Sequence, residues 1–165
     1  MLKLTKKVDY GLIALKHLAE AAKAEGAFAA CSAKEIAEAY DLPQEALAKI
    51  LQRLVKGRFL ISHHGTNGGY MLSRRAEDIS TLEVILAIDG PLFITSCSTD
   101  HSDCQQLSKC SVKEPLAKVS HSIREVLAKI SIADMMDQKD PRSRSRNEED
   151  ESKPAQAVSS LVTLA

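Results

Sequence analysis

The feature that most constrains the fold of this chain is a pair of short helices separated by a tight turn. Ser32 and Glu35 have the spacing of a capping box, which predicts a helix over residues 33–40. A turn is expected at 41–43, because its proline suits the start of a following helix. Apolar residues then recur at helical spacing over residues 44–56. Two short helices joined in this way predict a helix-turn-helix.

A glycine-rich hairpin follows the second of these helices directly. Strands are expected at 59–63 and 69–73, on either side of the turn at 64–68. A helix-turn-helix that continues into a hairpin is a winged helix, and the combination is more specific than either part. The expected fold class is mainly α with a small β-hairpin: a winged helix-turn-helix head plus a long C-terminal helix for dimerisation.

Two further helices complete the expected head. Thr5 suits the N-cap of a helix that Gly26 ends. Ser80 and Glu83 form a second capping box, for a helix that ends at Ile88.

A long amphipathic helix is expected over residues 112–136. Ser111 and Glu114 have the spacing of a third capping box. The apolar residues then recur at alternating steps of four and three, which is typical of a helix that pairs with another helix. We therefore expect a homodimer held by the seam of Val112, Leu116, Val119, Ile123, Val126 and Ile130.

The 165 residues suffice for one domain with a tail, and 44% of them are hydrophobic, which is ample for a core. We expect a winged-helix regulator over 1–136, followed by a charged, low-complexity tail at 137–165 that is disordered. Within the regulator, the DNA-binding head spans 1–75, the connecting helix 76–95, a cysteine loop 96–111 and the dimerisation helix 112–136.

The net charge of zero conceals two oppositely charged halves. Residues 1–75 carry 12 Lys and Arg against 7 Asp and Glu, a balance of +5, whereas residues 76–140 carry 6 against 11, a balance of −5. A basic front half agrees with a surface that meets phosphates. No stretch has the length of a membrane span and the N-terminus does not resemble a signal peptide, so a cytoplasmic protein without a membrane partner is expected.

Three of the four cysteines lie within fourteen residues of a polar loop. Cys97, Cys104 and Cys110 follow the spacing Cys-x6-Cys-x5-Cys, which is too wide for the paired cysteines of structural zinc sites. It suits ligands that wrap a larger group, so the loop predicts an iron–sulfur cluster, either 2Fe–2S or 4Fe–4S. The alternative is three incidental free thiols. Cys31 lies far away in sequence and is expected to be a small packing residue.

The order of these parts resembles the family of iron–sulfur winged-helix regulators to which IscR, NsrR and RirA belong. The likeness rests on Leu4-Thr-Lys-Lys-Val-Asp-Tyr-Gly11, Gly65-Thr-Asn-Gly-Gly-Tyr70, the 83–90 helix, the three cysteines and the long helix. Gly90-Pro-Leu, Ile123-Arg-Glu and Ala133-Asp-Met are most similar to proteobacterial regulators of the SUF iron–sulfur assembly genes. The resemblance covers residues 1 to about 136. It implies a dimeric transcription factor whose cluster, held by the cysteine loop at the dimer interface, alters operator binding.

A cluster usually needs four protein ligands, so one is missing from the three cysteines. IscR-like members place a histidine three residues after the third cysteine, where this chain has Lys113. NsrR-like members supply a carboxylate from the partner subunit at the position of Asp9. We favour Asp9 over the loop residue His101, and the alternative role of Asp9 is an ordinary first-turn aspartate that suits the helix dipole.

Polar residues on the second helix of the helix-turn-helix are the candidates for contacting DNA. Gln44 and Lys49 are expected to reach base edges, and Arg53 and Lys56 to hold phosphates. Many members of the family have arginine at the position of His64, before the first wing glycine. The full candidate set is Gln44, Glu45, Lys49, Gln52, Arg53, Lys56, His63, His64, Gly65 and Gly68.

The function predicted from these features is that of a DNA-binding transcriptional regulator, a repressor of SUF iron–sulfur assembly genes that senses cluster status. A nitric-oxide- or iron-responsive repressor of the same family is the alternative, because a cluster reacts to all of these signals. An iron–sulfur electron carrier is more remote, because electron transfer does not require a winged helix. No arrangement of nucleophile, base and oxyanion donors is recognisable, so an enzyme is not expected.

Overall fold

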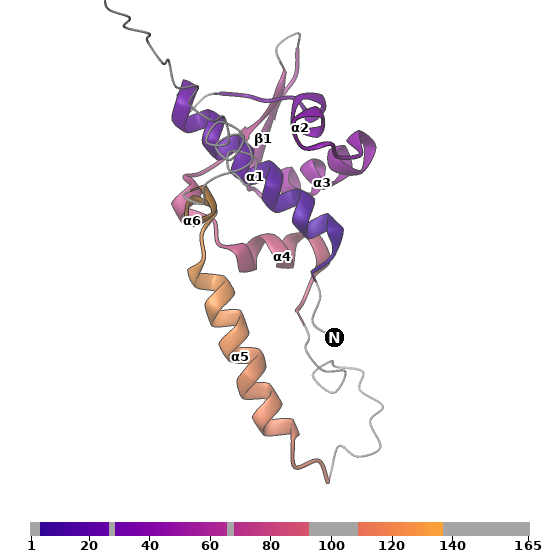
Figure 1. Cartoon of the computed structure of the whole chain (residues 1–165), viewed down its shortest axis with the longest axis vertical. Helices are drawn as coiled ribbons and strands as arrows, with labels where there is room; N and C mark the ends of the chain where they lie inside the picture. The colour runs from indigo at the N-terminus through magenta and orange to yellow at the C-terminus, as the bar shows by residue number, and fades with distance from the viewer. Residues whose placement is uncertain (1–3, 27–28, 66–67, 93–108, 137–165) are drawn as a thin grey trace, which may run out of the picture.

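The computed structural model describes residues 4–26, 29–65, 68–92 and 109–136 (Figure 1). The order of elements confirms a mainly helical fold with a single two-stranded hairpin in the described part of the chain. The elements are α1 (Lys6–Glu25), α2 (Ala33–Tyr40), α3 (Gln44–Lys56), β1 (Leu60–His63), β2 (Gly69–Leu72), the short 3-10 helix η1 (Ala76–Asp78), α4 (Thr81–Asp89), α5 (Lys113–Lys129) and α6 (Ile132–Met136).

The helix starts of the head follow the predicted caps. The Thr5 hydroxyl accepts a hydrogen bond from the Val8 backbone N–H at 3.4 Å, and Gly26 ends α1. In the Ser32–Glu35 box, the serine accepts from the glutamate N–H at 3.2 Å and the carboxylate accepts from the serine N–H at 2.6 Å. The Ser80–Glu83 box at the start of α4 has the same pair of bonds. Each cap satisfies backbone donors that a helix start leaves free.

The third predicted capping box is wrong. α5 begins at Lys113, its N-cap is Val112 with φ −98°, and no side chain caps it. Ser111 lies in the preceding turn, and Glu114 instead pairs with Lys118 at 3.4 Å along the exposed helix surface. The i,i+4 ion pair therefore replaces the expected reciprocal hydrogen bonds.

The helix expected over 112–136 is not continuous. It ends at Lys129, and Ser131 opens α6 with a capping box of its own: the Ser131 N–H donates to Asp134 at 2.7 Å and the Asp134 N–H donates to the Ser131 hydroxyl at 3.2 Å. Between the two helices the Ile130 carbonyl accepts from the Thr81 N–H at 2.8 Å and from the Thr81 hydroxyl at 2.9 Å. The Ile132 N–H donates to the Ile79 carbonyl at 2.9 Å. We call these contacts the clasp, because they return the chain to the start of α4.

The core lies among α1, α2, α3, α4 and α6, and the hairpin closes one side of it. Ile132, fully buried, belongs to this core although it follows the long helix. We refer to α1–α4, the hairpin, η1 and α6 together as the head. Its largest fully buried side chains are Val8, Leu15, Leu18, Ile36, Leu47, Leu51, Leu54, Ile79, Val84, Ile85 and Ile132.

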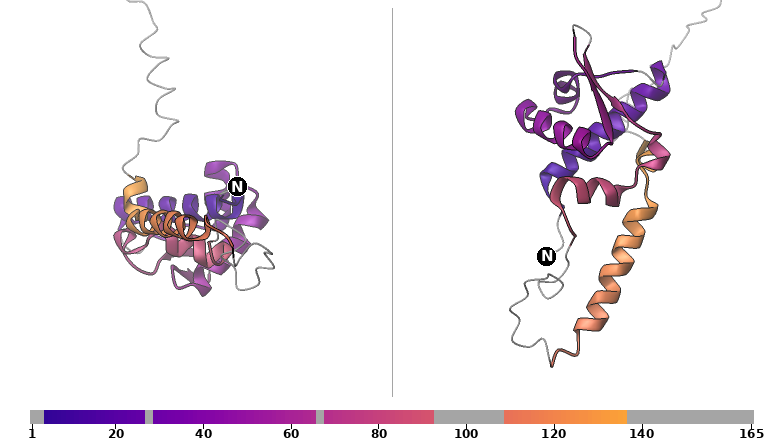
Figure 2. Two further views of the ribbon diagram at one scale, coloured as in Figure 1. Left: turned by 90° about the horizontal axis from the view of Figure 1, so that it is seen from below. Right: turned by 180° about the vertical axis from the view of Figure 1, so that it is seen from behind.

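The hairpin and α5 project from opposite ends of the head (Figures 1 and 2). The hairpin is antiparallel, with Leu60 opposite Leu72 and His63 opposite Gly69. None of the described helices is long and apolar enough to cross a membrane.

Candidate DNA-binding face and cluster ligands

The α2–α3 pair has the geometry expected of a helix-turn-helix. Asp41 ends α2 in the left-handed conformation, with φ 53°, and its N–H donates to the Ala37 carbonyl. Pro43 precedes α3 as its N-cap, with φ −63° and no side-chain hydrogen bond. The aspartate tolerates the left-handed turn and the proline needs no backbone donor, so the two helices meet in a tight bend.

The polar residues predicted on α3 are all exposed. The opposite side of the helix is buried through Leu47, Ile50, Leu51 and Leu54, which fixes how α3 is turned. Glu45, Lys49, Gln52 and Lys56 follow at steps of four, three and four and so form one stripe. Exposed residues of this face are Gln44, Glu45, Lys49, Gln52, Arg53 and Lys56.

Arg53 has a structural partner that the sequence did not reveal. Its Nη1 donates to the carbonyl of Ile88 at 2.7 Å, in the last turn of α4. The contact satisfies a carbonyl that the helix end leaves free and places a cation at the negative end of the helix. Arg53 therefore ties the recognition helix to α4, and only its remaining donors are free for a phosphate.

The hairpin extends beyond its two strands through the segment before α2. Cys31 and Tyr70 exchange backbone hydrogen bonds, Cys31 N to Tyr70 O at 3.0 Å and Tyr70 N to Cys31 O at 2.8 Å. The Cys31 side chain packs against the core, which confirms the packing role expected for it. Burial, then Glu35 and Glu25, raise the pKa of its thiol. A thiol held protonated in this way is a poor nucleophile and a poor metal ligand.

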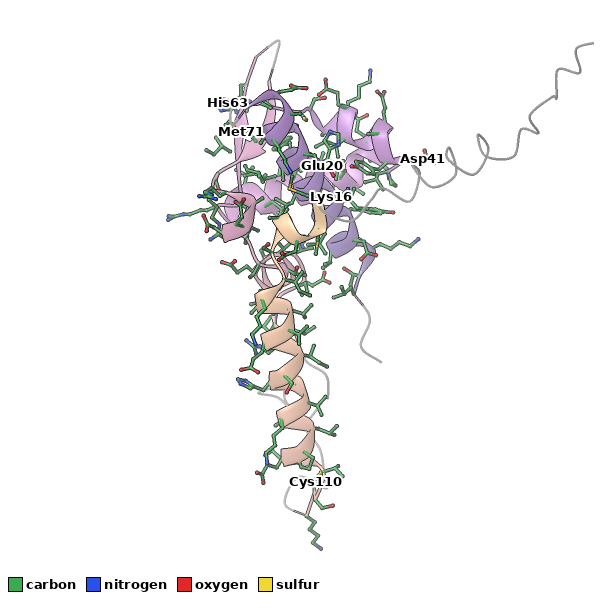
Figure 3. The ribbon with its side chains drawn as sticks, turned by 60° about the vertical axis from the view of Figure 1, so that its left-hand side comes forward. Lys16, Glu20, Asp41, His63, Met71 and Cys110 are labelled. Atoms are coloured by element: carbon green, nitrogen blue, oxygen red, sulfur yellow. The ribbon has the colours of Figure 1, made fainter. Side chains whose placement is uncertain are left out.

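The predicted wing residues lie at the tip of the hairpin. His63 and His64 are exposed, and the His63 Nε2 lies 3.0 Å from the sulfur of Met71 (Figure 3). Gly65 has φ 129°, a conformation that side chains rarely adopt. A Cβ at Gly68 would lie 2.6 Å from the His63 carbonyl. The structure thus gives these two glycines a conformational role, whether or not their backbone also approaches DNA.

The proposed carboxylate ligand lies where α1 begins and α4 ends. Asp9 is exposed in the first turn of α1 and has no side-chain partner among the described residues. The Thr5 hydroxyl, the cap of α1, donates to the Asp89 carboxylate at 2.6 Å. Gly90, with φ 83°, then ends α4. The chain therefore leaves α4 toward the cysteine loop beside the helix start that carries Asp9.

Cys110 lies far from that corner, at the end of α5 away from the head (Figure 3). It is a free, half-buried cysteine just before the helix. Cys97, His101 and Cys104 lie outside the described residues, as does the tail at 137–165. Within the described ranges no group of three or more His, Cys, Asp or Glu is close enough to hold a metal ion. Of the four predicted ligands, the described part of the chain includes Asp9 and Cys110.

Comparison with known proteins agrees with the fold. Residues 4–138 match the family model Rrf2, described as an iron-dependent transcriptional regulator. A curated rrf2-like HTH-type transcriptional regulator of Rhodobacter capsulatus is 29% identical over 146 residues, covering 86% of this chain and 97% of that protein.

Two solved structures are similar over most of the chain. The global cysteine regulator CymR of B. subtilis has a TM-score of 0.67 and 26% identity, over 85% of this chain and all of that one. IscR of T. potens has a TM-score of 0.62 and 31% identity, over 94% of each chain. The fold of this chain is thus similar to that of both proteins.

Proposed function

Because this chain belongs to the Rrf2 family of transcriptional regulators, we propose that it is a homodimeric repressor that senses iron–sulfur status through a bound cluster. Its proposed targets are the genes of SUF iron–sulfur assembly. One observation carries the proposal: the cysteine-bearing segment joins the end of α4, beside Asp9 and Arg53, to the start of a helix with an uncovered apolar seam. The DNA-binding head, the proposed cysteine ligands and the proposed dimer helix thus follow one another directly along the chain.

The proposed contacts with DNA follow from the exposed face of α3. Gln44 and Lys49 have the donors to reach base edges in the major groove, and Lys56 has the charge to hold a phosphate. His63 and His64 approach the backbone or the minor groove from the wing. A histidine has fewer donors than the arginine common at this position, so the wing contributes less to affinity here.

The proposed dimer is formed by α5. Four of the six seam residues are exposed in one chain: Val112 by 55%, Val119 by 47%, Val126 by 56% and Ile130 by 37%. Large apolar side chains repeated along one side of a helix are costly in water and are covered when two such helices pair. A pair of chains would present two α3 helices to successive turns of DNA.

The donors of the described part fit an iron–sulfur cluster. Cys110 is free and half-exposed, and the Asp9 carboxylate is exposed and unpaired within the described ranges, so neither is committed elsewhere. Cys97, Cys104 and Cys110 would hold the cluster together with Asp9 of the partner subunit. Such a cluster supplies a redox- and iron-sensitive centre. A carboxylate is a harder ligand than a thiolate and is more readily displaced from iron–sulfur iron.

The coupling to DNA rests on the Thr5–Asp89 and Arg53–Ile88 contacts. They link the first turn of α1, the end of α4 and the recognition helix into one unit. When Asp9 is held against the partner's cysteine loop, this unit is fixed relative to the partner, and with it the separation of the two α3 helices. Half-sites about one helical turn apart tolerate little change in that separation, and a few kcal/mol of differential binding suffices to switch occupancy.

The proposal is tested by anaerobic purification with iron and sulfide counts, followed by DNA binding before and after removal of the cluster. We expect brown protein with thiolate-to-iron absorption, and an operator affinity that changes when the cluster is removed. Cys104→Ser should lose the colour, whereas Cys31→Ser is the matched control that should keep it. A colourless protein that holds stoichiometric zinc would contradict the cluster.

The fourth ligand is tested separately by Asp9→Ala. We expect a cluster of shorter lifetime and a smaller effect of the cluster on DNA affinity. Glu25→Ala removes a carboxylate from the other end of the same helix and should change neither. If Asp9→Ala matched the unmodified protein in both measurements, His101 or a non-protein ligand would take its place.

A further inference from the structure

A cavity of about 700 Å³ lies at the junction of the hairpin, α1, η1 and α6, away from the DNA-binding face of α3 and from Cys110. Its walls are largely apolar, with Ala19 and Ala22 from α1, Ile61 and Met71 from the hairpin, and Ala133 and Met136 from α6. Ligand pockets for small molecules typically have about 300–1,000 Å³ and mostly apolar walls. This cavity therefore has the size and lining of a binding site for a small molecule.

The charged residues of the cavity favour an anion. Lys23, Arg74 and Arg75 line it together with a single acid, Glu77. Arg75 pairs with Glu77 at 3.3 Å, and Arg74 pairs with Glu83 at 3.0 Å. Lys23 has neither a hydrogen bond nor an ion pair with any other described residue. Its ammonium group is thus available to a ligand at the edge of an apolar cavity.

We propose that this cavity binds a small organic anion with an apolar body, whose carboxylate lies at Lys23 and whose hydrocarbon part fills the space between Met71 and Ala22. Removal of the apolar body from water favours binding, and the ammonium group selects an anion over a cation of the same shape. The lining of this site includes none of the proposed cluster ligands and none of the proposed DNA contacts.

The walls of the cavity connect a ligand with both ends of the molecule. Met71 lies opposite Ile61 in the hairpin, and its sulfur is 3.0 Å from the Nε2 of the wing residue His63. Ala133 and Met136 belong to α6, which directly follows α5 and which the clasp ties to the start of α4. A ligand that displaces the Met71 side chain therefore changes the surroundings of His63. If the ligand binds more tightly to one position of the hairpin than to another, ligand binding shifts the hairpin toward that position. By the same free energy, a shift of the wing changes the affinity for the ligand.

The test uses decanoate as the probe, with the full chain, in calorimetric titration. We expect saturable binding at one site per chain, and much weaker binding of decyltrimethylammonium, which has a tail of similar length and the opposite charge. Ala22→Phe should abolish binding because it fills the cavity, whereas Ala24→Phe, on an exposed position of the same helix, should not. Lys23→Gln should weaken binding by about two- to fivefold, as expected for a partly exposed ion pair, and Lys7→Gln should leave it unchanged.

A second measurement tests the coupling between the cavity and the wing. It uses the unmodified protein, so it does not depend on whether the variants fold. The imidazole NMR signals of His63 should shift on addition of decanoate, whereas those of His121, on α5, should not. The proposal is overturned if decanoate does not bind, if Ala22→Phe and Ala24→Phe bind it equally in folded protein, or if His63 does not respond. It is also overturned if decanoate binds only to a chain shortened after Met136, because residues 137–165 would then occupy the cavity in the full chain.

Discussion

The head and α5 are built in opposite ways. The head has a continuous core, three capping boxes counting that of α6, and hydrogen bonds that close its helix ends. α5 has no buried residue along its whole length and carries its apolar seam on the outside. The head therefore has what it needs to fold within one chain, whereas α5 is stabilised within one chain mainly at the clasp, where Leu127 packs against the core.

In the proposed function, this difference assigns stability to the head and association to α5. Most helical stability in proteins comes from packing of an apolar face, and a helix without such packing depends on an external partner. α5 is also the element next to Cys110, so in the proposed dimer its pairing would be linked through the chain itself to the binding of the proposed cluster. Changes that affect the head should therefore alter unfolding, and changes that affect α5 should alter association.

The largest effect is expected from a charge in the seam. Ile123→Glu would bury a carboxylate between two helices, at a cost of several kcal/mol, so the protein should become monomeric and lose affinity for a palindromic operator. The measurement is sedimentation of both proteins at the same concentration. Ser122→Glu puts the same charge on an exposed neighbouring position and should remain dimeric. A dimeric Ile123→Glu variant with normal DNA binding would exclude α5 as the interface.

The next effect should appear in the head rather than in association. Ile132 is fully buried, so Ile132→Ala should lower the free energy of unfolding by about 2–5 kcal/mol through lost burial and the cavity it leaves. Denaturant unfolding measures this. Val112→Ala, at the exposed far end of α5, should change the unfolding of the head by less than about 0.5 kcal/mol. Equal losses for the two variants would mean that head and α5 unfold as one unit.

A smaller effect separates two cations on α3. Arg53→Ala should lower the free energy of unfolding by about 1–2 kcal/mol because it removes a charged donor from the Ile88 carbonyl. Lys56→Ala should leave unfolding unchanged and reduce the slope of DNA affinity against salt by about one. Arg53→Ala should reduce that slope as well if its free donors hold a phosphate. Unfolding that is unaffected by Arg53→Ala would show that the contact adds no stability.

The sequence predicted most of the head because its signals are local. The Ser32 and Ser80 boxes, the wing glycines and the apolar spacing each act within a few residues, and each lies where the sequence placed it. The break after α5 also has a local signal, the Ser131–Asp134 box. It is masked because the next step of three in the seam falls on Ala133, so the apolar spacing continues across the break, whereas Ile132, which belongs to the core of the head, lies off that seam.

Less of the candidate site could be predicted. The exposure of the α3 stripe follows from its buried side and was predictable. The Arg53–Ile88, Thr5–Asp89 and His63–Met71 contacts were not, because each joins residues whose proximity depends on how the elements pack. The cavity was equally unpredictable, since its walls come from α1, the hairpin and α6. Residue types indicate which chemistry is possible, and tertiary packing decides which groups meet.

The smallest expected effect is a pH dependence confined to the head. Glu83 caps α4 through the Ser80 N–H at 3.0 Å and pairs with Arg74 at 3.0 Å. Burial raises the pKa of this carboxyl, but the hydrogen bonds from Ser80 and Arg74 outweigh it, so the pKa lies below its usual value of 4.5. Because the pKa of Glu83 is lower in the folded state, its charge stabilises the protein at pH values above the unfolded-state pKa. This contribution is lost as the pH falls through the folded-state pKa.

Glu83→Gln isolates that contribution, because glutamine can retain the cap but does not titrate. The carboxylate is partly exposed, so we expect the variant to be less stable by under about 1 kcal/mol at neutral pH. The difference should shrink as the pH falls below 4.5 and vanish once the glutamate is protonated. Glu45→Gln, at an exposed position of α3 with no partner among the described residues, should unfold like the unmodified protein at every pH. Denaturant unfolding between neutral and acid pH, with association monitored in parallel, decides the matter. If the Glu83→Gln difference persisted unchanged in acid, the charge on Glu83 would not be what stabilises α4.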